Sequence, residues 1–166
     1  MDHTLFPPSD HDHSRCENNL MAFAEHYCEG RGLRFTRLRQ DVLRAVASSH
    51  KAIGAYQILD AFAEQGKKLA PISVYRSLDF LQEAGLIHRL ESTNSFFACQ
   101  RNFEDGKSCC SDEPLVFLIC NECGTIGEMD GKPVAKTIRS FAEESGFAAE
   151  QSQIEISGLC RQCQAN

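Results

Sequence analysis

The chain lacks any apolar segment that approaches the roughly 20 residues needed to cross a membrane. Residues 1–14 carry aspartate and histidine and show no basic stretch followed by an apolar one, so a secretion signal is not predicted. The sequence also has no internal repeat, no phosphate-binding loop and no combination of nucleophile, base and orienting residue. These absences predict a cytoplasmic protein that is not an enzyme, and 166 residues are enough for one domain or two small ones.

Positive charge is scarce overall but is concentrated in the middle of the chain. The formal net charge of −6 argues at first against nucleic-acid binding. However, residues 31–90 hold ten basic and five acidic residues, whereas the flanking segments on both sides are acidic. A basic middle allows one face to contact phosphate while the whole protein stays acidic. Charge alone leaves a solvated, arginine-rich helix surface as an equal alternative.

Cysteine is abundant, and its spacing is informative. Nine cysteines, an odd number, favour metal binding over disulfides in a reducing compartment. Two Cys-x-x-Cys pairs, Cys120 with Cys123 and Cys160 with Cys163, supply the four thiolates of a closed tetrahedral zinc site, and Gly124 suits a turn around the metal. Two disulfides or a redox motif are the alternative. A thioredoxin-type pair opens a helix, whereas a strand is predicted after Cys123.

Hydrophobic periodicity predicts a winged helix-turn-helix over residues 18–99, after a disordered tail at residues 1–17. Two short strands, residues 86–91 and 96–99, flank four turn-forming residues and complete the wing. Cys28 falls on the inner face of the first helix and is expected in the core. Four helices are predicted, the first from Leu20, the second capped by Thr36, the third from Tyr56 and the fourth opened by Pro71.

The rest of the chain predicts a linker at residues 100–114 and a small dimerisation domain at residues 115–166, so the fold class is α+β. A unit of about 50 residues buries little surface, so it needs a metal, a partner chain or both. The cysteine zinc supplies the metal, and a homodimer is inferred for the partner. Strands are expected at residues 115–119 and 125–129 and around Ile154 and Ile156, and a helix at 133–146 with Val134, Ile138, Phe141 and Ala142 facing inward.

The helix opened by Pro71 is the predicted recognition helix. Its apolar positions face the core, which leaves Tyr75 and Arg76 facing outward in the first turn, the part that reaches base edges in helix-turn-helix proteins. Arginine can bind guanine with two hydrogen bonds. The alternative for Arg76 is a surface salt bridge to Asp79 or Asp60.

Residues outside that helix are expected to support DNA binding. Tyr56 is placed to reach a phosphate or a thymine methyl group. Arg34, Arg37 and Arg39 either contact phosphate or are simply solvated.

The predicted wing brings two possible zinc ligands together. A turn centred between Thr93 and Asn94 would place His88 directly opposite Cys99, with Cβ atoms about 4.5–5.5 Å apart. Such side chains can share one ion, and an imidazole with a thiolate favours zinc over iron(II) or manganese(II). Alternatively, His88 caps the wing surface and Cys99 is a core thiol.

Three stretches of this sequence together resemble the Fur family of metal-dependent repressors. They are ISVYRSLDFL at residues 72–81, GLIHR at residues 85–89 and the two cysteine pairs. The segment ESTNSFFAC at residues 91–99 is similar to the zinc uptake regulator (Zur) branch. The resemblance runs from about Leu20 to Cys163. It implies a homodimer that binds double-stranded operator DNA when loaded with zinc and represses zinc-uptake genes.

The chain departs from the family pattern in two places. Thr36 is followed by Arg37 where the family often has proline, which adds a charge at a helix start. The linker also lacks the histidine-rich run common in iron-responsive members, which argues against an iron sensor.

The resemblance implies two zinc ions per subunit, the structural one in the cysteine pairs and a regulatory one. Its regulatory ligands carry over to His88, Cys99 and Glu128, although Glu128 by itself would be read as solvated. The remaining ligand should come from the linker, where no histidine stands. Cys110 is the preferred candidate, with Cys109 as its substitute and Asp112 or Glu113 less favoured. Alternatively, the two cysteines are linker thiols that bind no metal.

Three other functions are open to the sequence. An iron- or peroxide-sensing repressor of the same family would differ in metal preference. A zinc storage or delivery protein would use the tail histidines and spare cysteines and would not bind specific DNA. A thiol-disulfide enzyme would show reductase activity.

Overall fold

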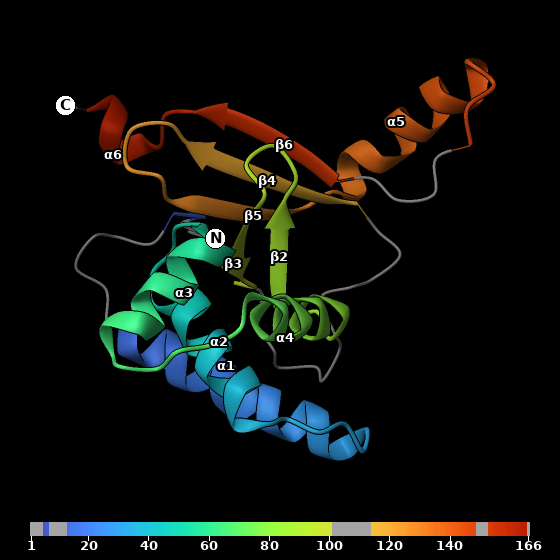
Figure 1. Cartoon of the computed structure of the whole chain (residues 1–166). Helices are drawn as coiled ribbons and strands as arrows, with labels where there is room; N and C mark the ends of the chain where they lie inside the picture. The colour runs from blue at the N-terminus through green and yellow to red at the C-terminus, as the bar shows by residue number, and fades with distance from the viewer. Residues whose placement is uncertain (1–4, 7–12, 101–113, 149–152, 166) are drawn as a thin grey trace. The chain divides into compact units, whose positions relative to one another are not determined.

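The computed structural model describes residues 5–6, 13–100, 114–148 and 153–165, which belong to two compact units (Figure 1). The N-terminal unit comprises the described residues from 13 to 100. The C-terminal unit comprises residues 114–165 with the short segment 5–6. Within the described residues no helix is long and apolar enough to span a bilayer.

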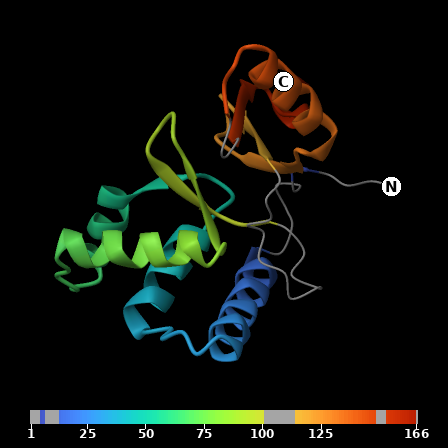
Figure 2. The same ribbon diagram turned by 90° about the vertical axis from the view of Figure 1, so that its right-hand side faces the viewer.

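The N-terminal unit is a helical layer with a small antiparallel sheet. Its sheet has the order β1-β3-β2, and in Figure 2 the hairpin of β2 and β3 extends beyond the helices. This is the predicted winged helix. Its elements are α1 (His13–Gly30), α2 (Arg37–Ala47), β1 (Ile53–Gly54), α3 (Ala55–Glu64), α4 (Pro71–Glu83), β2 (Ile87–Leu90) and β3 (Ser95–Ala98).

Local chemistry explains where these helices begin and end. The Thr36 hydroxyl accepts a hydrogen bond from the Arg39 amide and caps α2. Pro71 occupies the first turn of α4, where its fixed φ and missing N–H do no harm. Gly85 follows α4 with a φ of +68°, and Leu86 N then donates to Leu81 O. The predicted caps are therefore confirmed.

The core of this unit forms where the apolar stripes of the helices meet. Val74, Leu78 and Leu81 of α4 are fully buried, as predicted. Burial of each such side chain contributes about 1.5–3 kcal/mol. Cys28 is also in the core, and burial raises the pKa of its thiol. This packing presents the opposite side of α4 to solvent.

The N-terminal helix starts earlier than expected. It begins at His13, so the prediction of a disordered tail is wrong for residues 13–17. Leu5 and Phe6 also pack within the C-terminal unit, where a Cβ at Gly127 would lie 3.2 Å from the Phe6 ring. Residues 1–17 are mostly polar, so the sequence predicted neither the early start of α1 nor the packing of Leu5 and Phe6.

The wing has a different register from the predicted one. His88 pairs with Phe97, so the prediction that it stands directly opposite Cys99 is wrong. The turn comprises residues 91–94, and Asn94 adopts the left-handed conformation with a φ of 49°, which asparagine tolerates. The sequence did not determine the centre of the turn because several adjacent residues favour turns equally.

The C-terminal unit is a three-stranded sheet of order β5-β4-β6 with two helices. Strands β4 and β5 are antiparallel, whereas β4 and β6 are parallel and need the crossover through α5. The elements are β4 (Leu115–Cys120), β5 (Ile126–Asp130), α5 (Lys132–Glu144), β6 (Gln153–Gly158) and α6 (Arg161–Gln164). The short α6 was not predicted.

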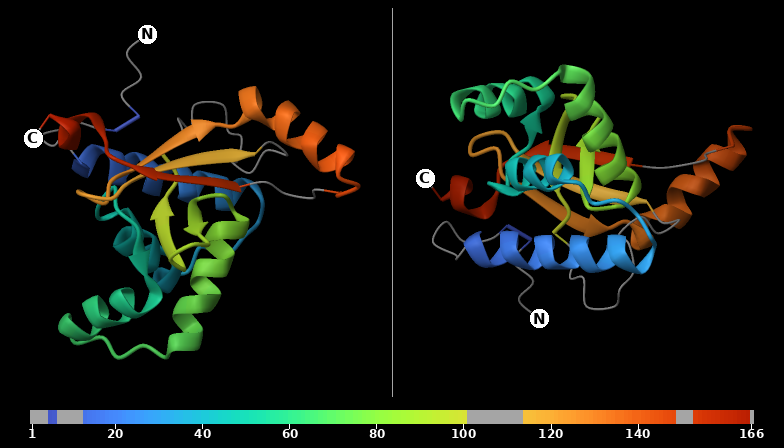
Figure 3. Two further views of the ribbon diagram at one scale, coloured as in Figure 1. Left: turned by 90° about the horizontal axis from the view of Figure 1, so that it is seen from above. Right: turned by 60° about the horizontal axis from the view of Figure 1, so that its bottom comes forward.

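Helix α5 carries an apolar stripe that is not buried within the chain. No described residue of α5 is buried, and Phe141 is 66% exposed. Figure 3 shows α5 running away from the sheet. The prediction that Val134, Ile138, Phe141 and Ala142 face an intrachain core is therefore wrong, because periodicity reveals an apolar face but not what covers it.

Candidate metal centres and nucleic-acid interface

The four cysteines of the two pairs converge in the C-terminal unit. Cys120 ends β4 and Cys123 lies in the following turn, whereas Cys160 is the N-cap of the short helix α6 and Cys163 lies within it. Their sulfurs all lie within 4.8 Å of one another, and Cys123 Sγ is 3.8 Å from Cys160 Sγ. Two sulfurs bound to one tetrahedral zinc at about 2.3 Å stand about 3.8 Å apart. The cluster therefore fits a zinc ion.

Tight turns position these sulfurs. Gly124 N donates to Cys120 O at 2.9 Å, and Gly124 needs its φ of +73° to close this turn. Asn121 N donates to Gly158 O at 2.8 Å and ties the first pair to the strand that leads into the second. None of these cysteines is in a disulfide.

The cluster has the electrostatics of a cation site. The Cys160 amide donates to Cys120 Sγ at 3.3 Å and contributes most to lowering the pKa of Cys120 to about 6. A hydrogen bond with the Thr125 side chain lowers the pKa of Cys123. The Cys160 side chain is the main cause that raises the pKa of Cys163 to about 12. Crowded thiols therefore oppose full ionisation unless a cation balances the charge.

A second pair of donors lies in the wing. Cys99 N donates to Leu86 O at 3.1 Å, which extends the β2–β3 pairing by one position. Cys99 is thus the diagonal neighbour of His88 on the same face, within reach of a long side chain. Their ligand atoms lie within 4.8 Å, and the side chains are 6% and 4% exposed. His88 and Cys99 are therefore close enough to share an ion, as predicted, although the strand register differs from the predicted one.

The remaining predicted ligands are distributed over other parts of the chain. Glu128 lies on β5 of the C-terminal unit, opposite Phe117 of β4. Its carboxylate is a possible zinc donor. The predicted linker ligands lie outside the described residues: Cys109, Cys110, Asp112 and Glu113.

The exposed side of α4 and the start of α3 form the candidate DNA-binding surface. Arg76 is exposed, and none of the described carboxylates is within ion-pair distance of it. Tyr56 is 70% exposed. Tyr75, predicted to face outward, is instead half-buried against the core. Ile72, which the sequence did not single out, is exposed in the first turn of α4 and offers an apolar contact.

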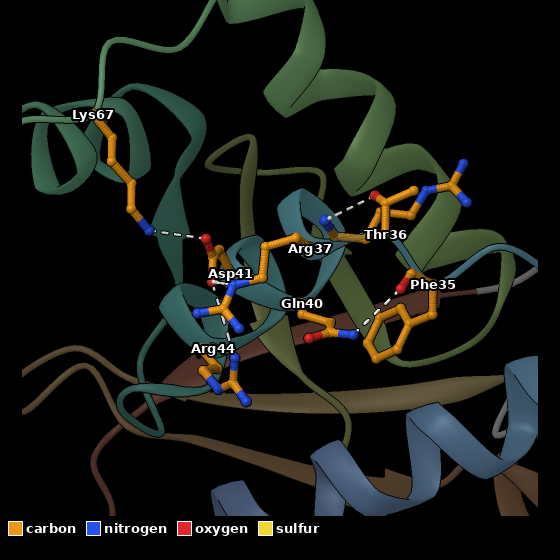
Figure 4. Close-up of polar contacts among 8 residues, drawn as sticks. Phe35, Thr36, Arg37, Gln40, Asp41, Arg44 and Lys67 are labelled. Carbon is orange, nitrogen blue, oxygen red and sulfur yellow. Dashed lines mark hydrogen bonds and ion pairs between the residues drawn. The ribbon is translucent and has the colours of Figure 1, made fainter.

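The arginines of α2 differ in their availability for phosphate. Arg37 Nε lies 3.3 Å from Asp41 while its side chain stays 78% exposed. Figure 4 shows that Arg44 and Lys67 also form ion pairs with the carboxylate of Asp41. The Arg39 guanidinium stacks 3.5 Å above the Phe80 ring and also donates to the Arg34 carbonyl. Arg39 therefore serves packing of α2 on α4, whereas Arg37 remains exposed.

Comparison with known proteins identifies similar chains. Residues 30–157 match the model of the ferric uptake regulator family. The chain is 37% identical over 147 residues to the zinc uptake regulation protein of Escherichia coli, which covers 87% of this chain and 81% of that protein.

The chain is also similar to solved structures of zinc uptake regulators. A zinc uptake regulator complexed with zinc and DNA matches 90% of this chain and 95% of its own, with a TM-score of 0.78 and 35% identity. The holo form of XcZur matches 90% of this chain and 99% of its own, with a TM-score of 0.76 and 36% identity.

Proposed function

The chain belongs to the ferric uptake regulator family, and from this premise we propose that it is a zinc-responsive transcriptional repressor. A zinc-loaded homodimer binds double-stranded operator DNA and represses genes for zinc uptake. The protein acts in the cytoplasm. It belongs to a family of transcriptional regulators, and we assign it no catalytic role. The DNA-binding domain runs from the start of α1 at His13, before the predicted bound of residue 18, to residue 99. The dimerisation domain comprises residues 115–166, and the linker at 100–114 joins the two.

The observation that carries this proposal is the buried pair of His88 and Cys99 in the wing. An imidazole and a thiolate within 4.8 Å of each other suit zinc better than iron(II) or manganese(II), which prefer harder donors. The similarity to a zinc uptake regulator complexed with zinc and DNA supports the same choice.

Each subunit holds two zinc ions in this proposal. The structural ion takes the four thiolates of Cys120, Cys123, Cys160 and Cys163, and its binding free energy contributes directly to folding of the small C-terminal unit. The regulatory ion takes His88, Cys99, Glu128 and one linker thiol. That thiol is Cys110, with Cys109 as its substitute.

Zinc would then act by shifting a population of arrangements. The regulatory ligands come from the wing, the linker and the C-terminal unit, so one ion that binds all of them selects one arrangement of the two units. DNA affinity rises only as far as zinc binds the competent arrangement more tightly than the others. A ligand that bound every arrangement equally would not change DNA binding.

DNA recognition falls to the exposed surface of α3 and α4. Arg76 reads base edges in the major groove, and Tyr56 contacts the backbone or neighbouring bases. Arg37 at the start of α2 and the accessible part of the half-buried Tyr75 add further contacts of this kind. Arg39, which is stacked on Phe80, contributes by holding α2 against α4. The uncovered apolar stripe of α5 supplies part of the contact between the two subunits.

The test is a DNA-binding titration at buffered free zinc, with iron(II) and manganese(II) as controls. The operator is first obtained by selection from a random DNA library with the zinc-loaded protein. Zinc should support binding at the lowest free metal concentration. Binding that responds to iron instead would establish an iron sensor, and selection that enriches no sequence would favour zinc storage or delivery.

A further inference from the structure

We propose that His13, Cys16 and His50 form a third zinc site, separate from the structural and regulatory ligand sets. His13 and Cys16 lie in the first turn of α1, and His50 lies in the loop between α2 and β1. One ligand atom from each lies within 4.8 Å of the others. All three belong to the N-terminal unit, so the cluster does not depend on how the two units are arranged.

The two imidazoles are already close to the geometry of a shared ion. His13 Nδ1 is 3.1 Å from His50 Nε2, and the rings meet edge to face with centroids 4.6 Å apart. Two nitrogens bound to one tetrahedral zinc at about 2.0–2.1 Å stand about 3.3 Å apart. An ion therefore requires only a small separation of the rings.

A backbone carbonyl fixes the tautomer of His13. His13 Nε2 lies 2.7 Å from Ala47 O, and a carbonyl can only accept, so this nitrogen carries the proton. In the neutral imidazole this tautomer leaves the lone pair of Nδ1 directed toward His50 Nε2, 3.1 Å away. A ligand histidine that donates its other N–H to a backbone carbonyl is the usual arrangement in metal sites.

The third donor and the surrounding space complete the site. Cys16 is exposed, so its sulfur is accessible to an ion, and cysteine binds zinc as the thiolate. The three side chains line a cavity of about 160 Å³, and Glu17 lines it as well. Two imidazoles and a thiolate are a zinc ligand set, and water or the Glu17 carboxylate takes the fourth position.

Occupancy of this site would join the start of α1 to the end of α2. Cys99, a proposed regulatory ligand, lines the same cavity. The bound ion would thus stabilise the first turn of α1 beside the end of the wing.

The site is tested by counting zinc on the full-length protein, because the count does not depend on DNA binding. The protein is dialysed against buffered free zinc, and bound zinc is measured by elemental analysis. We expect one fewer equivalent per subunit in His50→Gln and in Cys16→Ser than in the parent. His26→Gln is the matched control, since His26 is exposed on the same helix outside the cluster, and it should retain the full count.

A second measurement follows the Cys16 thiol directly. Zinc should protect Cys16 from alkylation in the parent, because the free thiolate is the nucleophile, and His13→Gln should abolish this protection while its helical circular dichroism is retained. Equal zinc counts in parent and variants, or alkylation of Cys16 unaffected by zinc, would show that His13 and His50 share only a hydrogen bond. Such a result would leave the repressor function untouched.

Discussion

At the scale of single residues, donor chemistry separates zinc from harder cations. The cysteine cluster is all sulfur, and the wing pair combines a thiolate with an imidazole. Thiolates are poor ligands for magnesium, calcium or manganese. Two arginines that the sequence assigned to DNA binding also differ in their surroundings. Arg39 stacks on the Phe80 ring, whereas Arg76 is exposed.

Arg76 gives the sharpest test of base recognition. Arg76→Ala should lose discrimination at particular base pairs, by about 1–3 kcal/mol, because two hydrogen bonds to guanine are removed. Arg37→Ala should instead weaken binding to all sequences about equally. Competition titrations with single-base operator variants distinguish the two effects. A parental specificity profile in Arg76→Ala would rule out its role in reading bases.

The linker cysteines test the regulatory ligand set. Cys110→Ser should leave the structural zinc and the dimer intact but shift zinc-dependent DNA binding to higher free zinc. Cys109→Ser should do much less. Cobalt substitution provides the measurement, since each thiolate ligand adds intensity to the charge-transfer band. If Cys109→Ser alone lowers the band and the zinc response, the adjacent cysteine is the ligand.

At the scale of elements, close backbone approaches define the ends of the C-terminal strands. Gly131, between β5 and α5, donates from its N–H to Pro114 O at 2.9 Å. A Cβ at this position would collide with that carbonyl group. Glycine is required here by a neighbouring chain segment rather than by a left-handed conformation.

Gly131→Ala should therefore destabilise the zinc-loaded protein by about 1–3 kcal/mol, the usual range for an overpacked site. Gly158→Ala is the control, because a Cβ there meets nothing within 4 Å, and its effect should stay within about 0.5 kcal/mol. Denaturant unfolding monitored by circular dichroism compares them. Equal unfolding midpoints for the two variants would show that the backbone adjusts freely around Gly131.

At the scale of the whole molecule, the C-terminal unit does not bury all of its apolar surface. Its small sheet and cysteine cluster provide a limited core, and α5 exposes an apolar stripe. A unit of this size is stabilised by a metal, a partner chain or both. The proposed dimer and the proposed structural zinc would both stabilise this unit, which buries little apolar surface by itself.

Phe141→Glu should weaken the dimer, because it places a charge on the apolar stripe of α5. Lys136→Glu, on the polar side of the same helix, is the matched control and should leave the dimer intact. Sedimentation equilibrium of the zinc-loaded proteins measures the dimer dissociation constant. An unchanged constant in Phe141→Glu would exclude this stripe from the subunit contact.

The sequence by itself determined most of the helices and strands and the donor chemistry of the candidate sites, but not the start of α1 or the presence of α6. Thr36, Pro71 and Gly85 set helix ends through local backbone preferences, which neighbours in the chain decide. Cysteine spacing predicted a single four-thiol cluster, and the structure brings the four sulfurs within 4.8 Å of one another. The spacing could do so because a tight turn holds the two thiols of each pair close together.

Tertiary structure alone decided the features that depend on distant neighbours. The wing register followed from which residues formed the turn, and Arg39 was assigned to packing only once Phe80 lay beneath it. The contact between His13 and His50 joins segments 37 residues apart. Local preference does not encode such pairings, because they arise when helices pack on a shared core.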